Sequence, residues 1–299
     1  MPVILGASRN RRDFLRMLGV TSGAVMLGGC ARLPFGRGKA PAVTRWALLA
    51  DTHVSLNAKE MQRGRCIDDN FKLVVDQLVK AAPEYVAIAG DLARLEGKEG
   101  DYRMFRDLVE PLASRFPVAV CFGNHDHREN FRKTLTLKAG EDPKVKGRRV
   151  RVVDQAGLRF ILLDSLLSER VTGGLLGKEQ RAWLEKFLDQ SDRRPTFLFL
   201  HHDLRDQDSA LLDADRFSKI ILPRKQVKAV FYGHTHAYRY EQVKGMHVIN
   251  IPAVGYNFSD KEPLGWIEAR FLSDGGEFTL HAFAGSMTNS GKTTSLAWR

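Results

Sequence analysis

The stretch Val118-Ala119-Val120-Cys121-Phe122-Gly123-Asn124-His125-Asp126 is an apolar run that ends in side chains able to bind metal through nitrogen or oxygen. Short runs rich in Val, Ile, Leu and Phe are typical of buried parallel strands. The carboxyl ends of parallel strands in an α/β sheet lie along one edge, so we expect one shared site there. Four other runs end in the same way: 47–50 before Asp51-Thr52-His53, 86–89 before Gly90-Asp91, 197–200 before His201-His202, and 227–232 before Gly233-His234-Thr235-His236.

The segments between these runs predict helices. Apolar residues recur at three- to four-residue spacing over 71–79, 102–112 and 183–188. Strands that alternate with helices predict a largely parallel sheet. After residue 232 the order changes, and four consecutive predicted strands indicate a second, mostly antiparallel sheet. Those strands are 239–243, 247–250, 265–272 and 277–284, and a further hairpin is predicted over 148–153 and 158–163.

Residues 1–29 resemble an export signal. Asn10-Arg11-Arg12-Asp13-Phe14-Leu15 resembles the twin-arginine motif, and the apolar run 17–29 after it is too short to span a membrane. The run closes at Leu27-Gly28-Gly29-Cys30, which resembles a bacterial lipobox whose cysteine would be lipidated. Small residues before a cleavage point fit ordinary signal cleavage as well. The expected localisation is therefore periplasmic, or at the membrane through Cys30.

The rest of the chain divides into three parts. Residues 30–44 contain Pro34 and Pro41 and predict a flexible linker. Residues 45–284 have the length of one α/β domain. Residues 285–299 are rich in Ser, Thr and Gly, and we expect a loose tail.

The net charge suits an anionic partner, but the Arg and Lys residues are spread over helices and loops, which favours a solvated basic surface. The net charge is +11, and residues 1–29 hold four Arg and one Asp, which leaves about +8 for the rest. This excess suits an anionic substrate or an anionic membrane surface. No basic stripe with interleaved aromatic residues is present, so nucleic acid is not the expected partner. Cys66 and Cys121 are expected to be free thiols, and no cysteine pair has zinc-finger spacing.

The histidines are concentrated at the predicted strand ends. Nine occur, and seven lie at or beside these ends. This concentration favours a metal site over loops that happen to contain histidine. Nitrogen and oxygen donors without thiolate favour Fe, Mn or Zn. The seven are His53, His125, His127, His201, His202, His234 and His236.

These motifs together resemble the five motifs of the calcineurin-like binuclear metallophosphoesterases in order and spacing. The resemblance covers residues 45–284. Gly-Asn-His-Asp at 123–126, followed by Arg128, is similar to the branch with class III cyclic-nucleotide phosphodiesterases and glycerophosphodiesterases. The resemblance implies a four-layer α-β-β-α sandwich, in which helices flank two mixed sheets and the dimetal site lies at the strand carboxyl ends.

The resemblance also implies roles for the site residues. Asp91 would bridge two metal ions. Hydroxide held between the metals would attack a phosphodiester or phosphomonoester, with His125 assisting the leaving group. His202 competes with His201 as a ligand, and we prefer His201 because it follows the strand directly. The ligands of one metal would be Asp51, His53, Asp91 and His236, and those of the other Asp91, Asn124, His201 and His234.

Arg94 departs from the family pattern. It stands three residues after Asp91, where some members carry an Asp or Asn that supports the catalytic histidine. Arg94 is either a surface residue or a contact to the substrate phosphate, a role in which Asn124 could also take part. What orients His125 stays open. A small phosphate ester is the expected substrate. The alternatives are a non-catalytic binding or scaffold protein on the same fold, which every filled ligand position disfavours, and a nuclease.

Overall fold

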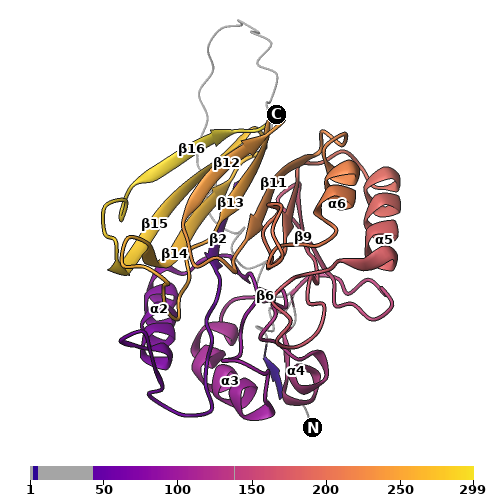
Figure 1. The fold of residues 1–299 in the computed structure, drawn as a ribbon. Coiled ribbons are helices and arrows are strands. Elements are labelled where there is room, and N and C mark those ends of the chain that lie inside the picture. The colour runs from indigo at the N-terminus through magenta and orange to yellow at the C-terminus, as the bar shows by residue number, and fades with distance from the viewer. Residues whose placement is uncertain (1–2, 6–42, 138) are drawn as a thin grey trace, which may run out of the picture.

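Two facing six-stranded sheets form the middle of the molecule, and helices cover their outer faces (Figure 1). The computed structural model describes residues 3–5, 43–137 and 139–299. The four-layer α/β architecture predicted from the sequence is confirmed. Among the described residues, no helix combines the length and apolar character that crossing a membrane requires.

The first sheet is mixed, with strand order β16-β15-β14-β2-β5-β6. Its parallel strands are β2 (Thr44–Leu49), β5 (Tyr85–Ile88) and β6 (Val118–Val120). Its antiparallel strands are β14 (Pro263–Phe271), β15 (Gly275–Gly285) and β16 (Thr293–Ala297).

The second sheet is also mixed, with strand order β12-β13-β11-β10-β9-β8. Its four central strands are parallel, and an antiparallel strand lies at each edge. The central strands are β13 (Met246–Asn250), β11 (Val227–Tyr232), β10 (Thr196–Phe199) and β9 (Leu158–Leu162). The edge strands are β12 (Arg239–Val243) and β8 (Arg151–Gln155), and the pairing of β8 with β9 confirms the predicted hairpin.

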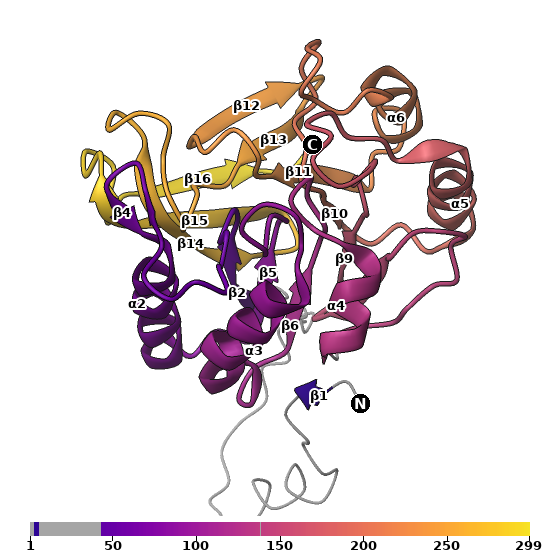
Figure 2. The same ribbon diagram turned by 60° about the horizontal axis from the view of Figure 1, so that its bottom comes forward.

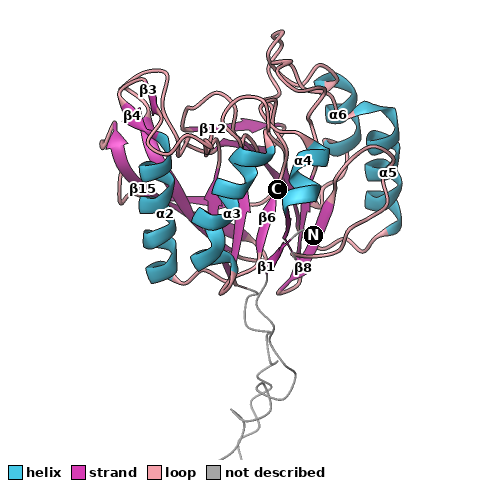
Figure 3. Ribbon diagram, turned by 90° about the horizontal axis from the view of Figure 1, so that it is seen from below, coloured by secondary structure: helices cyan, strands magenta, loops and turns pink. Residues whose placement is uncertain are grey.

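The three predicted helices are present. They correspond to α2 (Ile67–Ala81), α3 (Glu99–Ala113) and α5 (Gly177–Gln190), and the short helices α4 (Arg128–Thr134) and α6 (Ala214–Ile221) were not predicted. Helices α2, α3 and α4 lie outside the first sheet, and α5 and α6 lie outside the second (Figure 3). Two small sheets complete the described structure: β3 (Met61–Gln62) with β4 (Arg65–Cys66), and β1 (Val3–Leu5) with β7 (Leu135–Leu137).

The molecule has three separate hydrophobic cores, and each central strand sends alternate side chains into two of them. In β2, Leu49 packs under α2 and α3, whereas its neighbour Leu48 faces the second sheet. In β10, Phe199 belongs to the core between the sheets, and Leu198 packs under α5 and α6. Because successive strand side chains point to opposite faces, apolar residues at every position are what a doubly covered strand requires.

The predicted second sheet of four consecutive antiparallel strands is wrong. β12 and β13 pair with the second sheet, whereas β14 and β15 pair with the first. The connection 251–262 crosses between the sheets, where Ile251 N donates to Tyr232 O (2.8 Å) and Val254 N donates to Ala50 O (3.0 Å). The sequence pattern of the individual strands could not show this crossing. The hairpins β12–β13 and β14–β15 both have the sequence pattern of ordinary antiparallel strands, whichever sheet they join.

The loose C-terminal tail is also corrected. β16 pairs antiparallel with β15, and Trp298 Nε1 donates to Leu272 O (3.0 Å). Leu296 and Trp298 pack against the core between the sheets. Polar residues alternate with these two apolar residues. The overall composition of the segment is therefore polar and does not reveal a strand with one buried face.

The N-terminal predictions fall mostly outside the described residues. Arg11, Arg12 and Cys30 are not described, so the export signal, the lipobox and the linker stay predictions. The structure does pair β1 in parallel with β7, which the sequence did not predict. Figure 2 shows β1 below α3 and α4. Cys66 and Cys121 are free thiols, as expected.

Candidate metal centre

The predicted ligands converge where the carboxyl ends of two sheets meet. β2, β5 and β6 supply residues from the first sheet, and β10 and β11 supply residues from the second. The single sheet edge expected from the sequence is therefore corrected to two facing edges. Hydrogen bonds join them: His234 N donates to Asp51 Oδ2 (3.0 Å), and His201 Nδ1 contacts Ala89 O (2.8 Å).

One group of ligands gathers around Asp51. His236 Nε2 lies 3.4 Å from Asp51 Oδ1, and His53 Nε2 lies 4.0 Å from the same oxygen. The two imidazoles approach to 3.1 Å between their Nε2 atoms. All three side chains are buried. This is the set predicted for the first metal, apart from the shared carboxylate.

The second group gathers around His201. Its Nε2 lies 3.1 Å from His234 Nδ1 and 3.3 Å from Asn124 Oδ1. Asp91 Oδ2 is 3.4 Å from the same nitrogen. These are the four side chains predicted for the second metal.

Asp91 lies between the two groups. Its Oδ2 is 3.7 Å from His53 Nε2 and 3.4 Å from His201 Nε2, and its Oδ1 accepts from His125 N (2.9 Å). A carboxylate in this position can serve both groups, as a bridging ligand must. The structure thus places Asp91 where the sequence predicts the bridge.

The donor chemistry fits bound cations. His53 Nδ1 faces Arg94 O (3.4 Å) and His236 Nδ1 faces Tyr256 O (2.6 Å). A carbonyl oxygen only accepts, so each Nδ1 carries the proton and each Nε2 presents a lone pair. Two lone pairs aimed at each other across 3.1 Å repel unless a positive charge lies between them, either a shared proton or a metal ion. Such carbonyl contacts are also the usual support of metal-binding histidines.

The backbone of the site is held in an unfavourable conformation. Five of the predicted ligands have positive φ, between 48° and 68°. Non-glycine residues adopt this left-handed region at a cost, and such residues cluster at functional sites. The five are Asp51, His53, Asp91, His234 and His236.

Three glycines leave room for the ligands. A Cβ at Gly123 would lie 2.2 Å from Asp91 Oδ1, and one at Gly233 would lie 2.6 Å from Asp51 Oδ2. At Gly90 it would lie 2.6 Å from His201 Nδ1. Each glycine thus admits a ligand that comes from a different strand.

The electrostatics of the site favour cations. Burial would raise the pKa of Asp91, but His201, His125 and His53 hold this pKa well below its usual range. Burial would lower the pKa of His201, but Asp91 and Asp51 raise it to about 9. Burial lowers the pKa of His53 to about 3, and the pKa of His234 to about 4. Without metal, a proton on His201 compensates the carboxylates, and a bound cation would take its place.

His125 lies beside the two groups. Its Nε2 is 3.9 Å from Asp91 Oδ2, and its side chain is 20% exposed, so a substrate can reach it. Its Nδ1 contacts Leu95 O (2.9 Å). The carbonyl of Leu95 therefore orients His125, which the sequence left open. No sequence signal identifies a backbone carbonyl as a partner.

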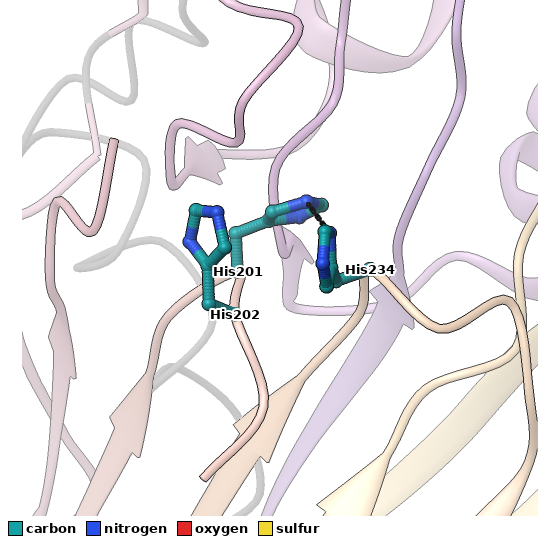
Figure 4. A group of neighbouring side chains, drawn as sticks. All are labelled: His201, His202 and His234. Carbon is teal, nitrogen blue, oxygen red and sulfur yellow. Dashed lines mark hydrogen bonds between the residues drawn. The ribbon is translucent and has the colours of Figure 1, made fainter. Parts of the chain in front are cut away.

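His201 and His202 differ in their surroundings. Figure 4 shows His201 turned toward His234, with His202 on its other side. Ser165 Oγ accepts from the backbone N–H of both histidines and contacts His202 Nδ1 (2.8 Å). The hydroxyl proton is thus directed to Nδ1, which places the imidazole proton on Nε2. His202 then has no lone pair for a metal, a second reason to prefer His201.

Asp126 is an important residue to which the sequence gave no role. Its buried carboxylate accepts from Leu92 N (3.1 Å), Gly123 N (2.9 Å) and Tyr102 Oη (3.0 Å). It thus ties the loop after β5 to the loop after β6. Burial, with Asp91 nearby, raises its pKa to about 7. The only feature of the sequence that pointed to a role for Asp126 was its place in the Gly-Asn-His-Asp motif.

An aromatic pair covers the first ligand group. The ring of Tyr256 lies 4.9 Å from that of His53 and 4.6 Å from that of His236. Phe258 stacks on His236 at 4.4 Å and is 51% exposed. Both come from the 251–262 connection, so pattern analysis could not assign them to the site.

Arg94 is engaged by its neighbours. Its Nε donates to Glu60 Oε1 (2.6 Å), its Nη2 donates to Gln62 Oε1 (2.9 Å), and its side chain is 16% exposed. Its guanidinium lies 5.9 Å from the Tyr256 ring. A substrate contact from Arg94 stays a prediction. His127, for which no ligand role was expected, lies at the start of α4 and accepts from Asn130 N (3.4 Å).

Comparison with known proteins agrees with this geometry. A family model described as calcineurin-like phosphoesterase matches residues 44–238. The chain belongs to the calcineurin-like phosphoesterase family. The match spans every predicted ligand, so this calcineurin-like chain has the residues of a metal-dependent phosphoric ester hydrolase.

Two curated relatives are phosphodiesterases. A glycerophosphodiester phosphodiesterase, GpdQ of Enterobacter lignolyticus, is 25% identical over 233 residues, covering 73% of this chain and 81% of that protein. A 3',5'-cyclic adenosine monophosphate phosphodiesterase, CpdA of Haemophilus influenzae, is 26% identical over 243 residues, covering 76% and 85%. Among solved structures, a dimetal phosphatase from Danio rerio has a TM-score of 0.63 at 14% identity, covering 87% of this chain and all of that one.

Proposed function

We propose that this chain is an exported metal-dependent phosphoesterase that hydrolyses a small phosphodiester or phosphomonoester, with phosphodiesters the favoured class. The observation that carries the proposal is the position of Asp91 between two ligand groups, with His125 beside it. The diesterase activity named for two relatives supports the favoured class. Fe, Mn and Zn suit the donor set.

The two ligand groups would hold the metals as the sequence predicts, with Asp91 common to both. When bound, the metal pair would supply a hydroxide nucleophile near neutral pH and neutralise the charge of the phosphoryl oxygens. His125 is the proposed general acid, which donates a proton to the leaving group. Leu95 O accepts from Nδ1, so His125 can give a proton to the departing oxygen from Nε2 only in its cationic form, with both ring nitrogens protonated; Nδ1 keeps its proton afterwards.

A leaving-group comparison tests the role of His125. In His125→Ala, turnover of a diester with an alkoxide leaving group should fall by roughly 10² to 10⁴. Turnover of bis(p-nitrophenyl) phosphate should fall much less, because p-nitrophenolate leaves without a proton. Metal content should stay at the wild-type value, since His125 is not a proposed ligand. An equal loss on both substrates, or loss of metal, would contradict this role.

Arg94 is the proposed contact to the substrate phosphate, although Glu60 and Gln62 engage it. Arg94→Ala should raise the KM for the best diester. A wild-type KM and kcat would remove Arg94 from the substrate site.

Export rests on residues 10–30. In a variant in which both Arg11 and Arg12 are changed to Lys, the precursor should stay in the cytoplasm, as cell fractionation would show. Unchanged export would rule out the twin-arginine route. Incorporation of labelled fatty acid into wild type but not into Cys30→Ser would support lipidation, whereas no incorporation into either would favour ordinary signal cleavage.

The alternative functions have distinct signs. A binding or scaffold protein on this fold would show no turnover of mono- or diesters when fully loaded with metal. A nuclease would bind nucleic acid with an affinity that falls steeply with added salt. Neither alternative has an observation in its favour among the described residues.

A further inference from the structure

A cavity of about 720 Å³ lies next to α4, outside the metal centre. It is open to solvent on one side and is lined mainly by α4, β7 and the segment 142–151, and none of the seven predicted metal ligands lines it. Its volume is in the range of small-molecule binding sites. Phe122 and Arg128, at the two ends of the loop that carries His125, contribute to its wall.

The lining of the cavity is strongly basic. Six lysine or arginine side chains and three acidic side chains contribute to it. The basic residues are Arg128, Arg132, Lys144, Arg148, Arg149 and Arg151, and the acidic residues are Glu129, Asp142 and Glu169.

The acidic groups nearby are already paired. Asp164 binds Arg128 (2.7 Å), Glu129 binds Arg132, Asp142 binds Arg151 (3.3 Å), and Glu169 lies 3.8 Å from His127 Nε2. Within the described part of the chain, no carboxylate lies within 4.0 Å of a nitrogen of the Arg148 or Arg149 guanidinium. Neither guanidinium therefore forms a direct ion pair, and Asp164 acts on both of them only from a longer distance.

Arg149 is fixed in place. Its guanidinium lies 5.4 Å from the centre of the Phe122 ring and 5.1 Å from that of Phe131, and its Nη1 donates to Val120 O (2.8 Å). Arg148 donates through Nη1 to Leu166 O. Carbonyl oxygens satisfy single N–H groups but do not neutralise a guanidinium. A charge withdrawn from water without a partner is costly, so an anion in the cavity would be bound favourably.

The cavity also has an apolar part. Phe131, Leu135, Leu137 and Val145 contribute to its lining beside the basic groups. We propose that this cavity binds a phosphorylated small molecule, whose phosphoryl group pairs with Arg148 and Arg149 and whose organic part lies on these apolar side chains. Guanidinium groups match phosphoryl oxygens in two-point geometry, which a halide cannot provide, and a phosphoryl group has a third oxygen with which to reach a second guanidinium. A soluble phosphate ester and a phospholipid head group share this chemistry.

Equilibrium dialysis of the metal-loaded full-length enzyme with radiolabelled inorganic phosphate tests the site. Wild type should bind about one phosphate per chain more than Arg149→Met, because the metal centre keeps its own anion site in both. Lys144→Glu places a negative charge at the exposed rim without disturbing the core, and should weaken this additional binding at least about tenfold. Lys72→Glu, an exposed change of the same charge on α2, should have no effect.

The turnover of bis(p-nitrophenyl) phosphate and the melting temperature separate a binding role from a structural one. Both should stay near wild type in Lys144→Glu, so this variant decides the matter if Arg149→Met does not fold. Identical phosphate binding in wild type, Arg149→Met and Lys144→Glu would overturn the proposal, as would the absence of any additional phosphate in wild type.

Competition then distinguishes the two sources of the phosphoryl group. Dihexanoyl phosphatidic acid and glycerol 3-phosphate are compared by the concentration that each needs to displace the bound phosphate. If the lipid needs a concentration at least tenfold lower, the ligand is a lipid head group. Equal displacement by both would assign a soluble phosphate ester. Displacement by neither would contradict the proposal, because the apolar side chains would then not accept an organic group.

Discussion

At the scale of the residue, the metal centre consists of side chains held in places that an isolated chain would avoid. Five ligands have positive φ, and the Nε2 atoms of His53 and His236 face each other at 3.1 Å. Each strained residue costs roughly 1–3 kcal/mol, and such strain persists only where surrounding structure imposes it. The network of Asp126 and Tyr102 is part of that surrounding structure.

Metal binding should release a proton from one particular histidine. In the metal-free protein His201 has a pKa of about 9, above its unfolded value of 6.5, so it is charged at pH 7.5. Its contribution to stability is present below pH 6.5 and is lost as the pH rises through 9. His53 and His234, with pKa values of about 3 and about 4, are already neutral. A metal needs neutral imidazole, so loading at pH 7.5 should release roughly one proton from His201, in addition to any proton lost by a metal-bound water.

Calorimetric titration with metal in buffers of different ionisation enthalpy measures this proton. The observed enthalpy should depend on the buffer for wild type, and the number of protons released should be smaller by roughly one for His201→Gln. An enthalpy independent of the buffer in wild type would show that His201 is not protonated before metal enters.

Residue types at the strand ends, together with the family's motifs, predicted the candidate ligands, and the structure brings these side chains together. The partners of these ligands were not predictable. Leu95 orients His125 through its carbonyl oxygen, which any residue would supply. Tyr256 reaches His53 and His236 from a distant connection whose path depends on the tertiary structure.

At the scale of the element, each strand of the site ends in a turn that brings a ligand against a neighbouring strand. Periodicity predicted the strands and the helices α2, α3 and α5, because these segments bury regular faces. It could not predict which sheet β14 joins. That depends on the bridge between Ala50 and Ala253, far apart in the chain.

The turn after β6 should not accept a side chain. In Gly123→Ala the new Cβ would lie 2.2 Å from Asp91 Oδ1, so the bridging carboxylate would have to move. We expect a loss of about 1–3 kcal/mol in the free energy of unfolding, together with loss of bound metal. Denaturant unfolding and elemental analysis measure the two effects.

Gly291→Ala is the matched control for this change. Gly291 has φ of +76°, but no atom lies within 4 Å of the added Cβ. It should lose about 1–2 kcal/mol through backbone strain and keep its metal. Full metal content in Gly123→Ala would show that the close approach of β6 to Asp91 is not needed.

At the scale of the whole molecule, the site depends on two sheets held face to face. Aromatic side chains fill the space between them, and Trp298 closes one side of this core. Its ring lies 5.2 Å from that of Phe197 in the second sheet and 6.3 Å from that of Phe278 in the first. Only two apolar residues, Leu296 and Trp298, anchor the C-terminal segment to this core. The rest of the segment is mostly polar, so its composition predicted a loose tail.

Trp298→Ala should therefore destabilise the fold without changing the chemistry. Trp298 is only partly buried, so we expect about 2 kcal/mol, less than for a fully buried tryptophan. Metal content and turnover below the melting range should stay at wild-type values. Met287→Ala, a change at a 52% exposed side chain of the same region, should shift stability by at most about 0.5 kcal/mol. Unfolding equal to wild type in Trp298→Ala would mean that the tail does not hold the sheets together.

The central claim is that one carboxylate, Asp91, serves two metals, and the metal content of Asp91→Asn tests it most directly. Elemental analysis should find about two metals per chain in wild type and in Asp76→Asn, an exposed change of the same kind on α2. Asp91→Asn should lose at least one metal, and phosphodiester turnover should fall by about 10³ or more. Two metals per chain with turnover intact in Asp91→Asn would contradict the account.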